Sequence, residues 1–305
     1  MAVKHIRIGT RGSRLALWQA EFLREQLTQL GLDVELKIIK TQGDRVQDLG
    51  FDKLEGKGFF TKEIEEALLR GDVDLAVHSM MDLPTTAPEG LCVTAVSYRE
   101  NPADWLLIRK SVLTEKALLR LPEGARVGTS SARRKAQIRH LRPDVVLGDI
   151  RGNVPTRVQK LRDGQFDAIL LAAAGLQRLD LDLSDLAVIR LNVKEFVPAP
   201  AQGVLAYQVN TADTATRRLL RAIHHPEVSA VTNIERRVLQ LLDGGCQLPL
   251  GAYCERDAAG HYHLWAALAE SWDAPLHRVR HSSSTTYELA EKVVAELREK
   301  LRQNA

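Results

Sequence analysis

The sequence predicts an α/β protein with two similar lobes, followed by a smaller α+β domain. Up to about residue 195, short β-branched runs alternate with amphipathic helical segments, an order typical of sheets that are covered by helices. The same strand–turn–helix order occurs twice in this part. Beyond residue 212 the pattern changes to helices and then consecutive strands, which indicates a separate domain. The 305 residues are enough for two or three domains.

The first lobe is expected to begin with a strand at residues 6–8, followed by a Gly/Thr/Ser turn and a helix from about 13 to 30. Residues 34–39 read as a second strand. Thr61 is placed to cap a helix that ends near residue 70, and residues 75–77 form a third strand. This alternation predicts a largely parallel sheet with helices on both faces.

The second lobe repeats this order. Residues 126–128 are a strand, residues 132–141 a helix and residues 145–147 another strand. A further helix begins at Pro155, because proline suits the first turn of a helix, and residues 166–171 form a buried strand. Two such units create a cleft, and ligands of open α/β sheets bind at the carboxyl ends of strands.

A proline-rich segment at residues 197–201 crosses out of the second lobe. We expect a strand at residues 204–209 to return to the first sheet, so that this segment and the region near residue 101 form a pair of hinge strands. The predicted domains are residues 1–99 with 200–217, residues 105–195, and residues 222–305.

The C-terminal domain is predicted to contain two helices, three strands and a final charged helix. The strand-like runs are residues 250–256, 261–269 and 277–282. Helices followed by consecutive strands indicate a separate, smaller α+β domain.

Composition excludes several classes of protein. The apolar share is 45% and the charged share 27%, as in an ordinary soluble globular protein. Lys and Arg total 42 against 39 Asp and Glu, a net charge of +3, which is too even for a dedicated nucleic-acid binder. No stretch is apolar enough to span a bilayer, and we see no secretory signal. We therefore expect a cytoplasmic protein with neither nucleic acid nor membrane as partner.

The cysteine pattern argues against both a disulfide framework and a zinc site. The three cysteines, Cys92, Cys246 and Cys254, are odd in number and lack a CxxC spacing. No metal is expected.

Three segments place arginine or hydroxyl side chains where a helix begins: residues 10–13, 128–134 and 151–157. Free backbone N–H groups and the helix dipole favour an anion there, and arginine adds bidentate recognition of carboxylates. The plain alternative is that the hydroxyls are N-caps and the arginines are solvated. Three sites of one type favour a polycarboxylate ligand in the interlobe cleft. The phosphate-loop pattern GxxxxGK[ST] is absent.

A glycine-containing segment at residues 53–60 carries two lysines and two aromatics. It fits a mobile lid over an anionic ligand. It equally fits a long surface connection, and the residues alone leave both readings open.

Four motifs, taken together in order, resemble the signature segments of the porphobilinogen deaminase (hydroxymethylbilane synthase) family. They are His-Ser-Met-Met-Asp-Leu-Pro at residues 78–84, Gly-Thr-Ser-Ser-Ala-Arg-Arg at 128–134, Arg-Gly-Asn-Val-Pro-Thr-Arg at 151–157 and Gly-Gly-Cys-Gln at 244–247. Residues 9–13 through Gln19 and the Pro-Ala-Gln-Gly of residues 200–203 extend the resemblance over nearly the whole chain.

This resemblance implies two lobes like those of type II periplasmic binding proteins and a third domain that carries a cofactor. Cys246 would hold a dipyrromethane cofactor through a thioether and so prime the reaction. Four porphobilinogen units would be added with loss of ammonia, and hydrolysis would release hydroxymethylbilane for tetrapyrrole and heme biosynthesis. The protein would act as a cytoplasmic monomer. Cys246 follows two glycines, as in an exposed reactive loop, whereas Cys92 and Cys254 fit buried positions.

Asp82 would be the catalytic group. Loss of ammonia from porphobilinogen leaves a positive charge on the pyrrole, which a carboxylate stabilises while it assists proton transfer. Taken bare, an Asp before Leu-Pro is more often a turn or cap residue.

The resemblance also assigns the binding residues. The residues implied to bind the cofactor are Cys246, Ser79, Asp82, Thr129, Ser130, Ser131, Arg133, Arg134, Lys57 and Gln202. Those implied to bind substrate are Arg11, Ser13, Gln19, Lys53, Phe60, Arg151, Arg157 and Arg178. The arginines and hydroxyls would bind acetate and propionate side chains, and Phe60 would pack near the substrate pyrrole.

One position departs from the family pattern. The usual His-Ser-x-Lys-Asp has Met81 in place of the lysine that helps to hold a cofactor carboxylate. A charge-assisted hydrogen bond of about 1.5–3 kcal/mol would be missing. Another cation substitutes, the enzyme is impaired, or the chain is engineered or a diverged paralogue. We expect the fold and the cofactor site to be retained. The enzymatic activity is the property that Met81 could lower.

Two other functions fit part of the sequence. A non-catalytic or impaired bilobal protein that binds an anionic metabolite would explain the arginines, but it gives no role to the Gly-Gly-Cys segment. A nucleic-acid-binding regulator would need a basic recognition helix, and no helix-turn-helix segment is evident.

Overall fold

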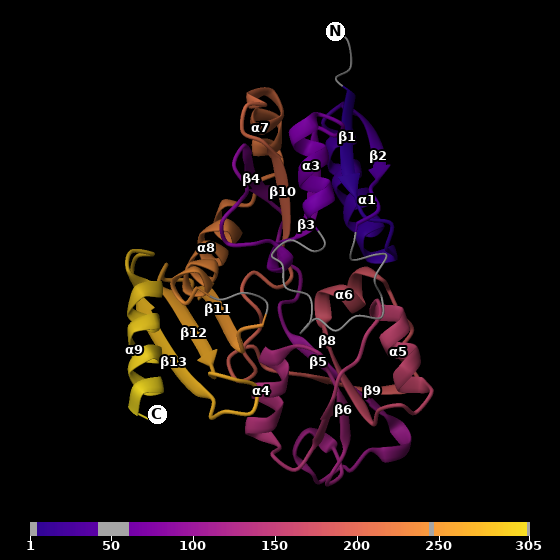
Figure 1. Cartoon of the computed structure of the whole chain (residues 1–305), viewed down its shortest axis with the longest axis vertical. Helices are drawn as coiled ribbons and strands as arrows, with labels where there is room; N and C mark the ends of the chain where they lie inside the picture. Colours follow the sequence, from indigo (N-terminus) through magenta and orange to yellow (C-terminus); the bar gives the residue numbers. More distant parts are fainter. Residues whose placement is uncertain (1–4, 42–60, 244–246, 304–305) are drawn as a thin grey trace. The chain divides into compact units, whose positions relative to one another are not determined.

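The computed structural model describes residues 5–41, 61–243 and 247–303 (Figure 1). The chain divides into two compact units, residues 1–100 with 203–229 and residues 101–202 with 230–305. The second unit contains both an α/β sheet and the small C-terminal sheet. The three-domain division with its boundaries stays a prediction.

The first unit contains a five-stranded sheet in the order β2-β1-β3-β10-β4. Its strands are β1 (His5–Thr10), β2 (Asp33–Ile38), β3 (Leu75–Ser79), β4 (Leu91–Val96) and β10 (Leu205–Asn210). β1 is parallel to β2 and β3, whereas β10 is antiparallel to β3 and β4. The predicted return of residues 204–209 to the first sheet is confirmed. The sheet is mixed but largely parallel, as predicted, because β4 is antiparallel to β10 and so runs in the same direction as β1, β2 and β3.

Helices of this unit bury one face each. α1 (Arg14–Gln29) begins after Ser13, whose side chain accepts from the amide of Ala16, and it buries Leu23 and Leu27. α3 (Lys62–Arg70) ends at Gly71, which adopts the left-handed conformation (φ 73°) that glycine tolerates best. α7 (Thr214–Leu220) follows β10. The core combines α1 with the sheet residues Ile6, Ile8 and Tyr207, all almost fully buried.

The second unit repeats this sheet in the order β7-β6-β8-β5-β9. Its strands are β5 (Asp104–Arg109), β6 (Arg126–Gly128), β7 (Val146–Gly148), β8 (Ala168–Ala172) and β9 (Leu186–Arg190). β6 is parallel to β7 and β8, and β5 is antiparallel to β8 and β9. The predicted repetition is confirmed. The antiparallel strands β10 and β5 are the first strands after each crossing segment.

Three helices follow strands of this second sheet. They are α4 (Ala132–Leu141), α5 (Val154–Arg162) and α6 (Ala173–Arg178). Ser131 caps α4, and Asn153 caps α5 one residue before its first turn, which contains Pro155. The short 3-10 helices of the described residues are η2 (Met80–Asp82), η3 (Lys110–Val112), η4 (Leu118–Arg120) and η5 (Arg221–Ile223).

The C-terminal part contains the three predicted strands, which form an antiparallel sheet in the order β11-β12-β13. Its elements are α8 (Pro226–Leu241), β11 (Leu250–Arg256), β12 (Tyr262–Leu268), β13 (His277–Ser283) and α9 (Leu289–Gln303). One face of this sheet packs on α8 and α9 through residues such as Cys254, Leu264, Val238 and Val293. Cys254 is 1% exposed, so the prediction that it belongs to the core is confirmed.

A buried ion cluster organises the second unit. Asp104, the first residue of β5, is fully buried. It accepts hydrogen bonds from Arg133 Nη1 at 2.6 Å and Arg134 Nη2 at 2.7 Å, and from Gln202 Nε2 at 3.1 Å. Burial alone would raise the pKa of Asp104, but the two guanidinium groups outweigh it and lower the pKa to about 2.

Replacement of Asp104 by asparagine should destabilise the fold strongly. It leaves two buried guanidinium groups without their carboxylate, which costs about 3–5 kcal/mol when one partner of a buried pair is lost. Urea unfolding followed by circular dichroism measures this. Asp149→Asn, which breaks the half-exposed pair with Lys135, is the matched control and should cost less than about 1 kcal/mol.

The same cluster predicts a pH effect with a definite sign. Because the folded pKa of Asp104 lies below its ordinary value of 3.8, its contribution is present above pH 4 and lost as the pH falls toward 2. The stability difference between wild type and Asp104→Asn should therefore shrink over that range. A difference that stays constant would contradict an ionised Asp104.

Candidate active site

Asp82 lies just beyond the carboxyl end of β3, in the short helix η2. Met80 and Leu83 on either side are 4% and 5% exposed, and the amide of Met80 donates to the carbonyl of Val204 at 2.9 Å. These apolar anchors fix the turn, while Asp82 is exposed. The sequence Met-Met-Asp-Leu thus presents a carboxylate at a strand end.

The carboxylate of Asp82 has a perturbed pKa although water reaches it. The surrounding protein disfavours its charged form and raises the pKa to about 6, and the positive charge of Arg11 opposes this rise. A carboxyl group with a pKa this close to neutrality is suited to exchange protons at physiological pH.

Two other predicted residues meet next to this turn. Gln19 on α1 is 4% exposed, and its Nε2 donates to Ser79 Oγ at 2.9 Å. Ser79 is the last residue of β3, three positions before Asp82. Ser13 caps α1 through the amide of Ala16 at 3.3 Å, so the plain cap interpretation holds for its described contact.

A buried polar chain behind β3 was missed from the sequence. Thr61 donates to Glu65 at 3.3 Å, Gln208 donates to Glu65 at 3.0 Å, and His78 Nε2 lies 3.0 Å from Gln208 Oε1. Burial lowers the pKa of His78 to about 4, so its ring is neutral at pH 7 and donates to the amide oxygen. The chain joins α3, β10 and β3. Its sequence signal was a glutamate among the apolar residues of one helix face and a glutamine within a buried strand.

In the second lobe, the predicted hydroxyl residues hold their own loop. Ser131 Oγ accepts from the amide of Arg134 at 3.4 Å, and Thr129 Oγ1 accepts from the amide of Ser131 at 3.3 Å. Ser130 Oγ donates to the carbonyl of Ile150 at 2.8 Å and accepts from its amide at 3.0 Å. The two hydrogen bonds of Ser130 join segment 129–134 to Ile150, the residue directly before segment 151–157. These bonds hold the loop in place.

The charges of this lobe do not balance locally. Asp104 neutralises one of the two charges carried by Arg133 and Arg134. Arg157, whose Nε donates to the carbonyl of Gly152 at 2.7 Å, has its pKa lowered to about 10 by desolvation and by the charge of Arg134. Like charges in a desolvated place favour an anion between them. Arg178, on α6, is also buried, and Arg151 is half-buried.

Several predicted site residues lie outside the described residues: Lys53, Lys57, Phe60 and Cys246. Within the described part of the chain, no group of three or more His, Cys, Asp and Glu side chains could hold a metal ion. Among the helices described, none has the length and apolar character needed to cross a membrane.

Comparison with known proteins shows the family to which this chain belongs. The family model "Porphobilinogen deaminase, dipyromethane cofactor binding domain" matches residues 6–218. The chain belongs to the porphobilinogen deaminase family. The porphobilinogen deaminase of Chloroherpeton thalassium is 41% identical over 297 residues, 96% of this chain and 93% of that protein. That of Syntrophobacter fumaroxidans is 45% identical over 266 residues, 87% of this chain and 82% of its own.

Solved periplasmic binding proteins share a weaker likeness with this chain. A probable amino-acid ABC transporter extracellular-binding protein from Bacillus subtilis matches with a TM-score of 0.44 and 13% identity, over 72% of this chain and 92% of that one. A periplasmic binding protein from Salmonella typhimurium matches with a TM-score of 0.41 and 12% identity, over 72% and 92% of the two chains.

The structure predicts that the positive charge of Arg11 lowers the pKa of Asp82. Arg11→Gln removes the positive charge that opposes desolvation, so the pKa of Asp82 should rise further above 6. Carboxyl ¹³C NMR titration of selectively labelled protein measures it. Arg24→Gln, an exposed change on α1 at the pair with Glu21, is the control. An Asp82 pKa that stays the same or falls in Arg11→Gln would contradict the assignment.

Proposed function

We propose that the chain joins four porphobilinogen molecules head to tail, with loss of ammonia, into linear hydroxymethylbilane for tetrapyrrole and heme biosynthesis. Membership of the porphobilinogen deaminase family supports this transferase reaction. The observation that carries the assignment to a site is Asp82, an exposed carboxyl group with a pKa of about 6 at the end of β3.

Asp82 is the catalytic group in this proposal. The bond between the aminomethyl carbon of porphobilinogen and the nitrogen of its protonated amino group breaks, and the nitrogen leaves with the electron pair as ammonia. The carboxylate of Asp82 stabilises the positive charge left on the pyrrole. A new carbon–carbon bond then forms, and the acceptor pyrrole loses a proton, which a group with a pKa near 6 accepts readily.

The family model is that of a dipyrromethane-binding domain, and the described residues fit such a polycarboxylate. Asp104 leaves one positive charge of the Arg133–Arg134 pair uncompensated, and Arg157 adds another nearby. The bound dipyrromethane supplies the pyrrole to which the first unit is joined. The residues we propose to hold it are Cys246, Ser79, Asp82, Thr129, Ser130, Ser131, Arg133, Arg134, Lys57 and Gln202.

Substrate recognition is assigned to a second group of residues. Guanidinium groups bind carboxylates bidentately, which suits the acetate and propionate groups of porphobilinogen. The part-buried Gln19–Ser79 hydrogen bond joins α1 to the end of β3, close to Asp82 in sequence. The residues proposed to bind substrate are Arg11, Ser13, Gln19, Lys53, Phe60, Arg151, Arg157 and Arg178.

We also propose that the protein acts as a monomer in the cytoplasm. The described cysteines Cys92 and Cys254 are free, and a reducing compartment would keep the Cys246 thiol available. Analytical ultracentrifugation tests the monomer, and a dimer at micromolar concentration would contradict it.

Asp82→Asn tests the proposed function. Turnover of porphobilinogen should fall by about 10²–10⁴-fold, because the neutral amide neither stabilises the cation nor accepts a proton. Asp72→Asn, an exposed change in the same unit at the pair with Arg70, should leave turnover unchanged. Near-normal turnover of folded Asp82→Asn would overturn the assigned role.

The pH profile gives a second readout of the same residue. Because the active form is the carboxylate and the pKa is raised to about 6, wild-type turnover should fall as the pH drops through 6. An acid limb near pH 4 would place the essential group elsewhere.

Met81→Lys tests the departure from the family pattern. A lysine next to Asp82 would restore a cation for a cofactor carboxylate, so turnover or cofactor content should rise. Met81→Leu is the matched uncharged control and should change neither. An unchanged Met81→Lys enzyme would mean that another cation already fills this role.

A further inference from the structure

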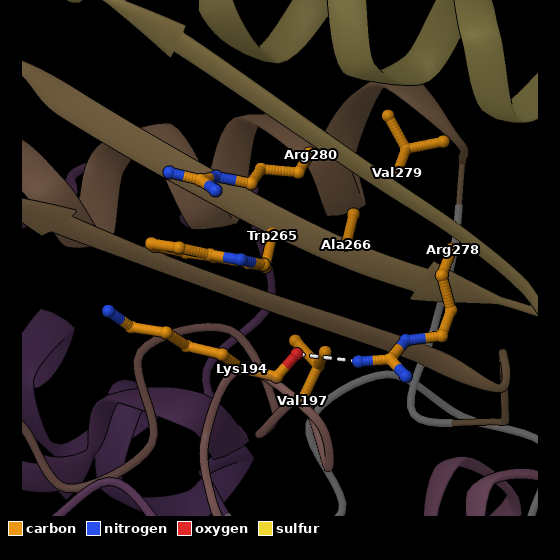
Figure 2. Close-up of a pocket in the computed structure, with 7 residues that line it drawn as sticks. All are labelled: Lys194, Val197, Trp265, Ala266, Arg278, Val279 and Arg280. Carbon is orange, nitrogen blue, oxygen red and sulfur yellow. Dashed lines mark hydrogen bonds between the residues drawn. The ribbon is translucent and has the colours of Figure 1, made fainter.

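The cations around a hollow of about 240 Å³ in the second unit are engaged with the protein itself. Lys194 Nζ lies 4.7 Å and Arg280 Cζ lies 5.0 Å from the ring centroid of Trp265, and Figure 2 shows the indole between these two side chains. Arg278 Nη2 donates to the carbonyl of Lys194 at 2.6 Å. The cations do not converge on one point, so they form a junction between the crossing segment and the C-terminal sheet and not a ligand site.

In the first unit, side-chain hydrogen bonds hold the end of β3 on both faces of the sheet. Successive residues of a strand point to opposite faces. Ser79 accepts from Gln19 Nε2 of α1 at 2.9 Å, and His78 Nε2 lies 3.0 Å from Gln208 Oε1 of β10. β10 pairs with β3, and α3 packs on both strands. The last two residues of the strand that leads to Asp82 are therefore both fixed by side-chain contacts.

The chain of hydrogen bonds that ends at His78 has a definite direction. Gln208 Nε2 donates to Glu65 Oε1 at 3.0 Å, and the hydroxyl of Thr61 donates to the other oxygen of this carboxyl group at 3.3 Å. The carbonyl oxygen of Gln208 therefore faces His78. Burial lowers the pKa of His78 to about 4, so the ring is neutral at pH 7. Its single proton must then lie on Nε2, where it donates to Gln208.

We propose that His78 is a positioning residue for the reaction, acting through the end of β3 on the carboxyl group of Asp82. This inference rests on the catalytic role proposed above for Asp82. Asp82 follows His78 by four positions, and the amide of Met80 between them donates to the carbonyl of Val204 at 2.9 Å. Without the donor at His78, the strand end loses its side-chain hydrogen bond to β10, and the turn that follows becomes looser.

A looser turn has two consequences for Asp82. The carboxyl group spends less time at the place where it acts on the pyrrole, and a misplacement of about 1 Å can cost about 10²-fold in rate. Water also reaches the carboxyl group more easily. Desolvation is the cause that raises the pKa of Asp82 to about 6, so better hydration lowers this pKa. The charge of Arg11, which also acts on Asp82, is unchanged by a substitution at His78.

Turnover of porphobilinogen by the holoenzyme variants His78→Leu and His78→Gln tests the proposal. Leucine removes the donor, whereas glutamine keeps a neutral amide N–H for Gln208. In His78→Leu, kcat should fall about 10–100-fold while KM changes less than about twofold, because the loss affects the transition state more than substrate binding. His78→Gln should recover most of this loss. The matched control is Gln26→Leu, which removes the acceptor of the Tyr207 hydroxyl on the same strand and should leave kcat unchanged.

The pH profile separates a positioning role from a merely structural one. In His78→Leu, the acid limb of turnover should move from about pH 6 to lower pH, and it should stay near pH 6 in His78→Gln and Gln26→Leu. His78 itself stays neutral above pH 5, and Glu65, the carboxyl group at the other end of its hydrogen-bonded chain, is retained in all three variants. A lower melting temperature without any shift of the acid limb or of kcat would overturn the positioning role.

This proposal and the proposed function fail in different ways. Near-normal turnover of Asp82→Asn would overturn the assigned reaction site itself. An inactive Asp82→Asn, together with normal kcat and an unchanged acid limb in folded His78→Leu, would overturn the role of His78 alone. Circular dichroism confirms that each variant is folded. Should His78→Leu not fold, His78→Asn takes its place in the comparison with His78→Gln, because the shorter amide does not extend to the position of the ring Nε2.

Discussion

The buried charge of Asp104 is the constraint on which the second unit depends. A carboxylate with no exposure needs cations and hydrogen-bond donors, and Arg133, Arg134 and Gln202 provide them. These partners join the first residue of β5, the start of α4 and the returning crossing segment. The same cluster carries two guanidinium charges against one carboxylate, which supports our proposal that this lobe binds a polycarboxylate.

In the first unit, the main feature is an exposed carboxyl group whose pKa is nevertheless raised. The buried side chains of Met80 and Leu83 fix the turn, and the chain from His78 through Gln208 to Glu65 fixes the strand before it. Asp82 is exposed and has a pKa of about 6. The positive charge of Arg11 opposes the rise of this pKa. In the reaction that we propose, such a group stabilises the positive charge on a pyrrole and accepts the proton that is lost afterwards.

Much of this was predictable from the sequence, where the signal was local. Periodicity and caps predicted α1, α3, α4 and α5, and the return of β10 to the first sheet was predicted from the proline-rich crossing. The sequence did not predict β4, β5 and β9. β5 was missed because it begins at Asp104, directly after the expected hinge. The other two were missed because we expected strands to alternate with helices. Asp104, Gln208 and Glu65 gave no signal as partners, because their significance depends on contacts distant in sequence. The roles of Arg133 and Arg134 toward a cofactor stay predictions, and so do the interlobe cleft and the residues outside the described ranges.

The central claim is that a dipyrromethane is attached to the thiol of Cys246, and intact mass spectrometry with peptide mapping tests it most directly. The purified protein should exceed its sequence mass by one dipyrromethane, and tandem fragmentation of the tryptic peptide 238–256 should place the addition on Cys246 and not on the buried Cys254. Cys254→Ala should keep the addition, and Cys246→Ala should lack it. An unmodified Cys246 in protein from cells with normal tetrapyrrole synthesis would contradict the account.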